Sequence, residues 1–287
     1  MNNLIIALLA NQEANKPPLI EPERDIPIRL GGGSPGVPTQ AEPPPSMELP
    51  QVASATLLLD LEADTLTVGD GNPASPWLDQ SGNSRDFTGN RVFHSDVDGG
   101  YVDGNGEDQS MTGLDFGDDL DKFAVFVVLK DLGWGGHLLD KLWASEDNNS
   151  YKGIEIISFD GAKVSFLLFD QDGVTSGGIQ TIDPITQPSV LTFEKVSNDA
   201  FSDGLRIYVD DVLQDVDVNG GGVPVSFSTT EPWRIGLCGG PGGETDAGFS
   251  PHAGRAYLIY QITDLDNWAT DRAAITAWLA DRYNITI

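Results

Sequence analysis

Short apolar runs separated by turn residues make up the chain from about residue 53 onward. Gly, Asp and Asn gather between the runs, for example in DQDG (170–173) and NGGG (219–222). The runs are rich in β-branched and aromatic residues, which pack well on the pleated surface of a sheet. This pattern predicts strands over 55–61, 123–129, 153–159, 164–169, 189–196, 205–209, 223–227, 233–237 and 255–262.

The segment after residue 262 follows a helical period instead. Asp266 or Asn267 is expected to cap its first turn, and Asn284 is expected to end it in a left-handed conformation. Large apolar side chains recur at helical intervals, which places them on one face: Trp268, Ile275, Trp278, Leu279 and Tyr283. We expect the aromatic side chains among them to pack this helix onto a sheet.

Many short strands and one terminal helix indicate an all-β fold, a two-sheet antiparallel sandwich with a C-terminal α-helix. Residues 51–287 are enough for a single large core. Residues 1–50 differ, because they hold ten of the 18 prolines and show no sustained period. Proline fixes φ and lacks an amide donor, so this segment is predicted to be extended. The chain is therefore predicted to consist of an N-terminal arm, 1–50, and one sandwich domain, 51–287.

A short apolar segment, LIIALLA (4–10), lies near the start of the arm. It is too short to span a bilayer. No basic residue precedes it, so a secretory signal is disfavoured. We expect it to dock on a partner protein through its large apolar side chains, Leu4, Ile5, Ile6, Leu8 and Leu9.

The formal net charge of the chain is −28 at pH 7. Such a surface repels phosphate backbones and anionic lipid, which argues against binding to nucleic acids or membrane surfaces. Cys238 is the only cysteine, so an intrachain disulfide and a thiolate metal site are both excluded. His94, His137 and His252 lack the spacing of metal ligands, and we expect each to be exposed or hydrogen-bonded within the fold.

Several segments follow an order that is typical of one family: LLLDLEAD (57–64), PWLDQSGNSRDFTG (76–89), FAVFVVLK (123–130), GLRIYVDDVLQ (204–214) and WRIGLCGG (233–240). In these segments the chain resembles concanavalin A-like, laminin-G-like jelly-roll domains, from about residue 57 to residue 287. The resemblance implies a fold that hosts lectins, adhesins, glycosidases and virion proteins. Asp210 and Asp211 stand where the family usually has Asn-Gly, and this pair favours a tight turn less than Asn-Gly does.

Glycosidases with this fold carry two carboxylates on one strand, in a Glu-x-Asp-x-x-Glu or Glu-x-Asp-x-Glu pattern. Glu62 and Asp64 begin such a pattern, but Leu66 and Thr67 stand where the second Glu belongs. GGSPG (32–36) matches the nucleophile-elbow string, but it lies in the proline-rich arm and not between a strand and a helix. The sequence therefore predicts no catalytic residues and no enzymatic activity.

The turn that contains Asp79 and Asn83 is the best candidate for a metal site. Carboxylate and amide oxygens are the ligands that calcium prefers. The alternative is an Asx-turn, in which both side chains form hydrogen bonds with local backbone. The sequence requires no cofactor, and calcium is the one cation that this turn suggests.

Aromatic side chains near a glycine-rich segment suggest a sugar-binding surface. Trp134 and Trp143 flank a segment that is predicted as a loop, and Tyr151 follows nearby. Exposed rings on a loop would provide stacking surfaces for sugars. The alternative for all three residues is packing in the core.

Two functions fit these observations. The first is a non-enzymatic structural protein of a phage virion: a capsid-decoration, head-fibre or similar accessory protein. Its arm would bind other virion proteins within a homo-oligomer or larger assembly. Its sandwich would project from the virion surface, with adhesion to glycans or to the host surface as a further role. The alternative is an extracellular or tail-tip lectin or adhesin module that binds carbohydrate with the help of calcium.

Overall fold

The computed structural model describes residues 48–104, 109–117, 120–132, 136–144, 151–159, 162–169, 176–186, 188–220, 229, 231–236 and 252–287. Residues 1–47, with the apolar anchoring segment, lie outside this description, as does the predicted strand 223–227.

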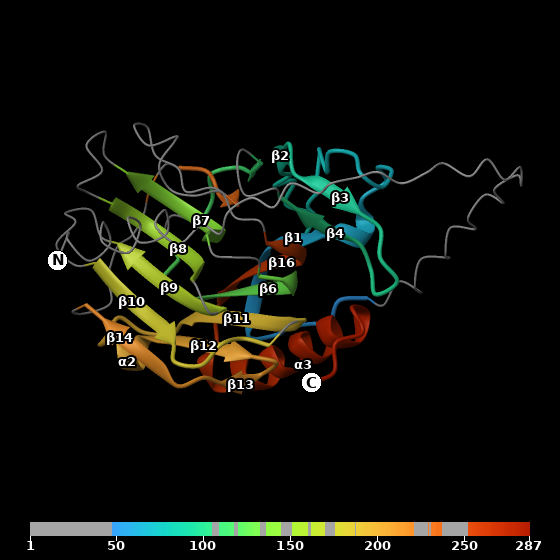
Figure 1. Ribbon diagram of the computed structural model, residues 1–287. Helices are drawn as coiled ribbons and strands as arrows, with labels where there is room; N and C mark the ends of the chain where they lie inside the picture. The colour runs from blue at the N-terminus through green and yellow to red at the C-terminus, as the bar shows by residue number, and fades with distance from the viewer. Residues whose placement is uncertain are drawn as a thin grey trace, which may run out of the picture. The chain divides into compact units, whose positions relative to one another are not determined.

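Two antiparallel sheets form a sandwich, and each has eight strands in the described part of the chain (Figure 1). The first is called here the helix-covered sheet, and β1 (Ala55–Glu62) pairs with its strand β16. Its other strands have the order β13 (Val212–Leu213), β12 (Leu205–Val209), β11 (Ser189–Lys195), β6 (Phe123–Asp131), β16 (Ala253–Ile262), β4 (Tyr101–Asp103) and β3 (Val92–His94). The second sheet has the order β14 (Val216–Asn219), β10 (Ser176–Thr181), β9 (Lys163–Phe169), β8 (Tyr151–Phe159), β7 (Gly136–Ala144), β15 (Arg234–Ile235), β5 (Met111–Thr112) and β2 (Thr88–Gly89). Short helical turns are η1 (Ala63–Thr65) and α2 (Phe201–Gly204).

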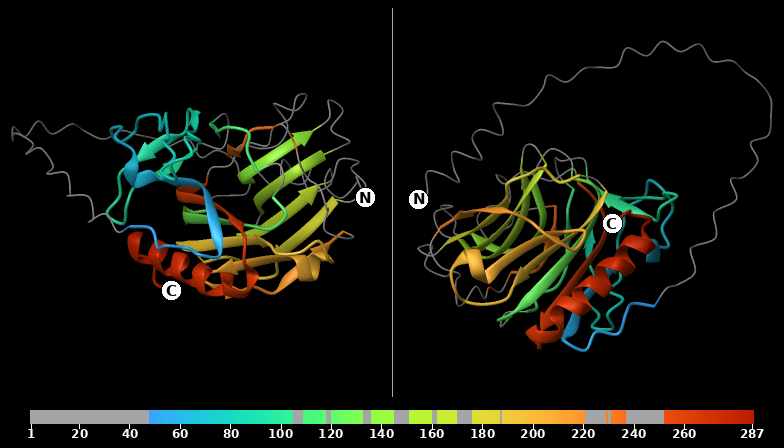
Figure 2. Two further views of the ribbon diagram at one scale, coloured as in Figure 1. Left: turned by 180° about the vertical axis from the view of Figure 1, so that it is seen from behind. Right: turned by 90° about the horizontal axis from the view of Figure 1, so that it is seen from below.

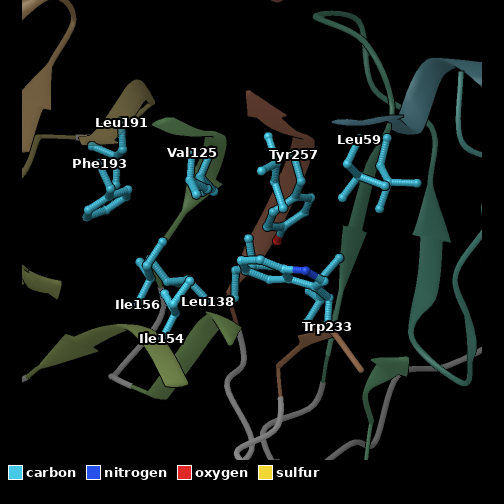
Figure 3. Packing of buried hydrophobic residues seen from close by; sticks show 14 of the residues in the cluster. Leu59, Val125, Leu138, Ile154, Ile156, Leu191, Phe193, Trp233 and Tyr257 are labelled. Carbon is cyan, nitrogen blue, oxygen red and sulfur yellow. The ribbon is translucent and has the colours of Figure 1, made fainter. Parts of the chain in front are cut away.

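The main hydrophobic core lies between the two sheets (Figure 3). Successive strand residues point to opposite faces, so every second residue enters this core. The helix-covered sheet contributes Leu59, Val125, Leu191, Phe193 and Tyr257. The opposing layer contributes Leu138, Ile154, Ile156 and Trp233. The sandwich that these residues fill confirms the predicted fold class.

Helix α3 (Leu265–Arg282) covers the outer face of the helix-covered sheet (Figure 2). Its buried face carries four of the five predicted packing residues, Trp268, Ile275, Leu279 and Tyr283, and Trp278 is half-buried. A second hydrophobic cluster fills this layer, so the prediction that aromatic residues pack the helix onto a sheet is confirmed.

The ends of α3 were predicted with different success. Asp264 caps the N-terminus, because its side chain accepts a hydrogen bond from the amide of Asp266 at 3.0 Å. The predicted caps, Asp266 and Asn267, are instead the second and third residues of the helix. At the other end Asn284 has φ 52°, which confirms the predicted left-handed residue.

The turn between β12 and β13 forms without an Asn-Gly pair. Asp210 and Asp211 both have positive φ, at 52° and 65°. Contacts from elsewhere in the fold hold both residues in this turn. Asp210 Oδ1 accepts from the amide of Val190 at 2.8 Å, and Asp211 Oδ1 accepts from Arg272 Nε at 2.6 Å. These tertiary contacts offset the cost of the left-handed backbone.

Strand β7 was not predicted. The segment before Trp143 was expected to be a glycine-rich loop, whereas residues from Gly136 onward pair with β8. Its charged pair, Asp140 and Lys141, interrupts the apolar run that would have indicated a strand. The partners of both residues come from other parts of the chain: Arg234 for Asp140, and Asp115 with the carbonyls of Thr229 and Glu231 for Lys141.

Candidate functional site

A row of eight residues, polar except for Leu167 and Gly178 and called here the polar row, crosses the outer face of the second sheet, the face that points away from the core. Each member is directly paired with the next, through the strand registers of the sheet. Each member except Asn219 has a core residue next to it in the sequence, so these members face outward. In spatial order the row is Thr88, Thr112, Arg234, Asp140, Glu155, Leu167, Gly178 and Asn219.

The centre of the row is a charged cluster of His137, Asp140, Glu155, Glu231 and Arg234. His137 Nδ1 lies 2.9 Å from Glu155 Oε1, and Arg234 lies 3.9 Å from Asp140 Oδ1. Arg234 also donates to Glu231 Oε2 at 2.7 Å. Three segments of the chain, β7, β8 and residues 231–234, therefore meet in this central charged cluster.

A β-bulge brings His137 onto the outer face. In a regular strand, residues 137 and 140 would point to opposite faces because the side-chain period is two. The register of β7 against β8 shifts between His137 and Leu139, so Leu138 is the extra residue. His137 then lies opposite Ile157, on the same face as Asp140 and Glu155.

The two carboxylates at the centre are compensated by cations. Asp140 and Glu155 lie directly opposite each other, and like charges in such positions destabilise a sheet. Burial by itself lowers the pKa of His137, but the adjacent Glu155 carboxylate and Asp140 outweigh it and raise this pKa above its usual value. His137 is therefore favoured in its charged form, and with Arg234 it balances the carboxylate pair.

Lys141 supports the cluster from the opposite side of β7. Its side chain is almost fully buried, and its Nζ donates to Asp115 Oδ1 at 2.5 Å. The same Nζ donates to the carbonyl oxygens of Thr229 and Glu231, at 2.6 and 3.1 Å. These bonds tie the segment before β15 to β7 and so help to place Glu231 and Arg234.

The predicted metal-binding turn contains an extensive hydrogen-bond network. Asp79 Oδ1 accepts from the amides of Asp60 and Ser81, and its Oδ2 accepts from the amide of Arg85 and the hydroxyl of Ser81, all at 2.7–3.0 Å. Asn83 Nδ2 donates to the carbonyls of Leu57 and Leu58. A cation at Asp79 would have to displace these donors. Among the described residues, no group of three or more His, Cys, Asp or Glu side chains is arranged to hold a metal ion. Calcium binding at Asp79 and Asn83 stays a prediction.

Two of the three predicted sugar-stacking residues, Trp143 and Tyr151, lie on strands of the same sheet. Trp134 lies outside the described residues. Trp143 is on β7 opposite Lys152, and Tyr151 is on β8 opposite Ala144, so their backbones are neighbours in the sheet. Whether these residues stack on sugars stays a prediction.

The central charged cluster was missed at the sequence level. Its local signals are isolated charges inside apolar strands, Glu155 in GIEIISF (153–159) and Arg234 in WRIG (233–236). An isolated charge of this kind is a weak signal, because most charged residues are solvated. Separately, no helix in the described ranges is both long and apolar enough to cross a membrane.

Comparisons with known proteins give structural neighbours only. No family model matches the sequence, and no curated protein matches it. Trypanosoma rangeli sialidase, in complex with sialic acid, superposes with a TM-score of 0.51 at 11% identity, over 82% of this chain and 34% of that one. Domain 4 of AbnA, an extracellular GH43 arabinanase from Geobacillus stearothermophilus, in complex with arabinotriose, gives 0.49 at 16%, over 78% and 99%. CBM40 of Ruminococcus gnavus IT-sialidase, bound to α2,3-sialyllactose, gives 0.42 at 12%, over 55% and 84%. The chain thus spans about a third of the sialidase's length.

The superposition on the sialidase supports a β-sandwich fold. The prediction that the chain has no enzymatic activity is corrected, because it is contradicted by the sialidase, a glycoside hydrolase, among the structures that share this fold. The prediction rested on the absence of a Glu-x-Asp-x-x-Glu or Glu-x-Asp-x-Glu motif, in which both carboxylates come from one strand. Asp140 and Glu155 show that two strands can bring carboxylates together as well.

Proposed function

We propose that this chain is a carbohydrate-binding β-sandwich module whose ligand lies along the polar row of the second sheet. The observation that carries the proposal is the row itself, with the charged cluster fixed at its centre. Sugars present many hydroxyl groups that donate and accept hydrogen bonds, and sites for them need a few precisely placed polar groups. The sialidase that shares the fold was solved with a bound sugar, which supports the same class of ligand.

The parts of the cluster have different roles in this proposal. Asp140 is fully buried and Glu155 nearly so, so the two form the floor of the row. The side chains of Arg234 and Glu231 keep 12% and 18% of their exposure and are the groups that a ligand reaches. Arg234 is planar and offers a rigid fork of donors, which suits paired sugar hydroxyls.

Replacing Arg234 with alanine is expected to weaken glycan binding by about tenfold or more, which is about 1.4 kcal/mol. The measurement is a glycan array with the full-length chain, followed by titration calorimetry with the best ligand. Arg206→Ala is the matched control, because Arg206 is an exposed arginine on β12 of the other sheet. Equal binding by the Arg234 and Arg206 variants, both folded by circular dichroism, would place the ligand elsewhere.

The proposal also includes the structural role in a virion that the arm predicts. This role gives the module its location. It is supported by the sequence of residues 1–50, an apolar segment followed by a proline-rich stretch. In this proposal the arm binds other virion proteins and the sandwich presents its glycan-binding face at the virion surface.

Deleting residues 1–47 is expected to leave a folded sandwich that no longer joins its assembly. The cut stops at residue 47 because Leu49 and Val52 pack against the cluster beneath α3. Thermal unfolding checks the fold, and co-sedimentation with particles checks assembly. Normal incorporation of the truncated chain would refute anchoring by the arm.

A further inference from the structure

We propose that the ligand of the polar row is a neutral sugar, and that sialic, uronic and other acidic sugars are disfavoured there by charge. This inference rests on the proposed function and specifies its ligand. It contrasts with the sialidase that shares the fold, which was solved with sialic acid.

The cations around the centre of the row already have carboxylate partners. His137 pairs with Glu155, and Arg234 pairs with Asp140 and Glu231. An acidic sugar is recognised through charge-assisted bonds from a cation, usually a bidentate arginine. To bind one here, Arg234 would have to give up a carboxylate that it already holds, so most of the gain would be lost.

Lys141 does not change this balance. Its Nζ is 2.5 Å from Asp115 Oδ1, and its side chain is buried on the core side of β7. The three cations His137, Lys141 and Arg234 are thus set against four carboxylates, those of Asp115, Asp140, Glu155 and Glu231.

The surroundings of the row carry negative charge, as the central charged cluster does. Asp217 is exposed on β14, at the end of the row that holds Asn219. The whole chain carries a formal charge of −28. A negative field of this kind lowers the local concentration of anionic ligands and slows their association, and salt screens the effect.

A neutral sugar finds suitable partners along the row. Carboxylate oxygens of Glu231 accept hydrogen bonds from sugar hydroxyls without any requirement for charge on the ligand. Thr88, Thr112 and Asn219 add hydroxyl and amide groups at the two ends. The row therefore offers hydrogen bonds to an uncharged polyol at its centre and at its two ends, with Leu167 and Gly178 between the centre and Asn219.

The test compares sugars that differ only in an acidic group: lactose with 3′-sialyllactose, and xylotetraose with the same oligosaccharide carrying glucuronic acid. Binding to the full-length chain is measured at about 20 mM and about 500 mM NaCl, conditions that differ strongly in charge screening. For each pair in which binding is detected, we expect the neutral sugar to bind about tenfold more tightly than its acidic partner at low salt. This difference corresponds to a modest coupling between charges. Its affinity should not depend on salt, whereas that of the acidic sugar should improve with salt.

The variant Glu231→Gln sharpens the test, because it removes the most exposed carboxylate of the cluster and keeps its size. In this variant the difference in affinity between the neutral and the acidic sugar should become smaller. Asp217→Asn should reduce this difference in affinity less. Tighter binding of the acidic sugar at low salt would overturn this inference and leave the proposed function standing. Failure to bind any glycan on the array would overturn the proposed function and this inference together.

Discussion

Replacing Trp268 with alanine is expected to lower the free energy of unfolding by about 3–5 kcal/mol, the usual cost of deleting a buried tryptophan. Trp268 is 2% exposed and packs against Phe126 and Tyr260 beneath α3. Its Nε1 also donates to Glu194 Oε1 at 2.6 Å, so the variant leaves a buried carboxylate with one donor fewer. Thermal or urea unfolding monitored by fluorescence measures the loss of stability. The midpoint of thermal unfolding should fall by roughly 10 °C.

Trp278→Ala is the matched control on the same helix. Trp278 is half-buried, with the Arg282 guanidinium 5.2 Å from its ring centroid, so its loss should cost only about 1 kcal/mol. Trp268→Phe separates packing from hydrogen bonding, because it keeps an aromatic ring and removes the N–H donor. Equal losses for the two alanine variants would mean that α3 is not anchored through Trp268.

Stability is expected to fall as the pH rises from 6.5 to 9, which is the reverse of ordinary acid denaturation. Burial, together with Glu62 and Asp79 nearby, raises the pKa of Asp60 to about 8, and burial raises the pKa of Glu62 to about 7. Asp60 is 4% exposed, and its Oδ1 has no hydrogen-bond partner in the described structure. Among the described residues, Arg282 is the cation that lowers the pKa of both Asp60 and Glu62, and it is ion-paired with Glu62.

The sign follows from proton binding. The folded state holds protons on Asp60 and Glu62 at pH values where the unfolded chain has released them. The stabilisation is complete below the unfolded pKa values and is lost as the pH rises through about 7 for Glu62 and about 8 for Asp60. The loss between pH 6.5 and 9 should be about 2–3 kcal/mol.

Asp60→Asn checks this mechanism, since asparagine has a similar shape and cannot ionise. The variant should be more stable than the wild type, and its advantage should grow by about 2 kcal/mol between pH 6.5 and 9. Asp271→Asn is the control. Hydrogen bonds from Ser54 lower the pKa of Asp271, so its titration lies well below this range. That variant should lose stability equally at both pH values. An unchanged slope in Asp60→Asn would show that Asp60 is ionised in the folded state.

The sequence predicted those elements whose signals are local. Strands β6, β11 and β16 are rich in apolar, β-branched and aromatic residues, and α3 has a clear helical period. The strands and the helix were therefore found with small errors at their ends. Strand β7 was missed because the partners of its charged residues, on β8, on β15 and in the segments around residues 115 and 229–231, are far away in the sequence. The cap of α3 was misplaced by two residues, since the segment offers three Asp or Asn residues that can each act as a cap.

The candidate site depended on contacts that no sequence pattern contains. Glu155 and Arg234 are almost eighty residues apart and meet only through the order of strands in the second sheet. His137 lacks the sequence spacing of a metal ligand, so no functional role was predicted for it from the sequence. It joins Glu155 because one bulge changes the face on which it lies. A search for carboxylates on one strand could not find Asp140 and Glu155, which lie on two.

The sequence by itself determined the all-β class, the strand–helix ending, the acidic surface and the separate composition of the arm, because each is a property of neighbouring residues or of composition. The tertiary structure decided which polar residues face outward together and which carboxylates are neutralised. It also decided which carboxyl groups under α3 have raised pKa values. These properties depend on strand order, register and burial, which bring together residues far apart in the chain.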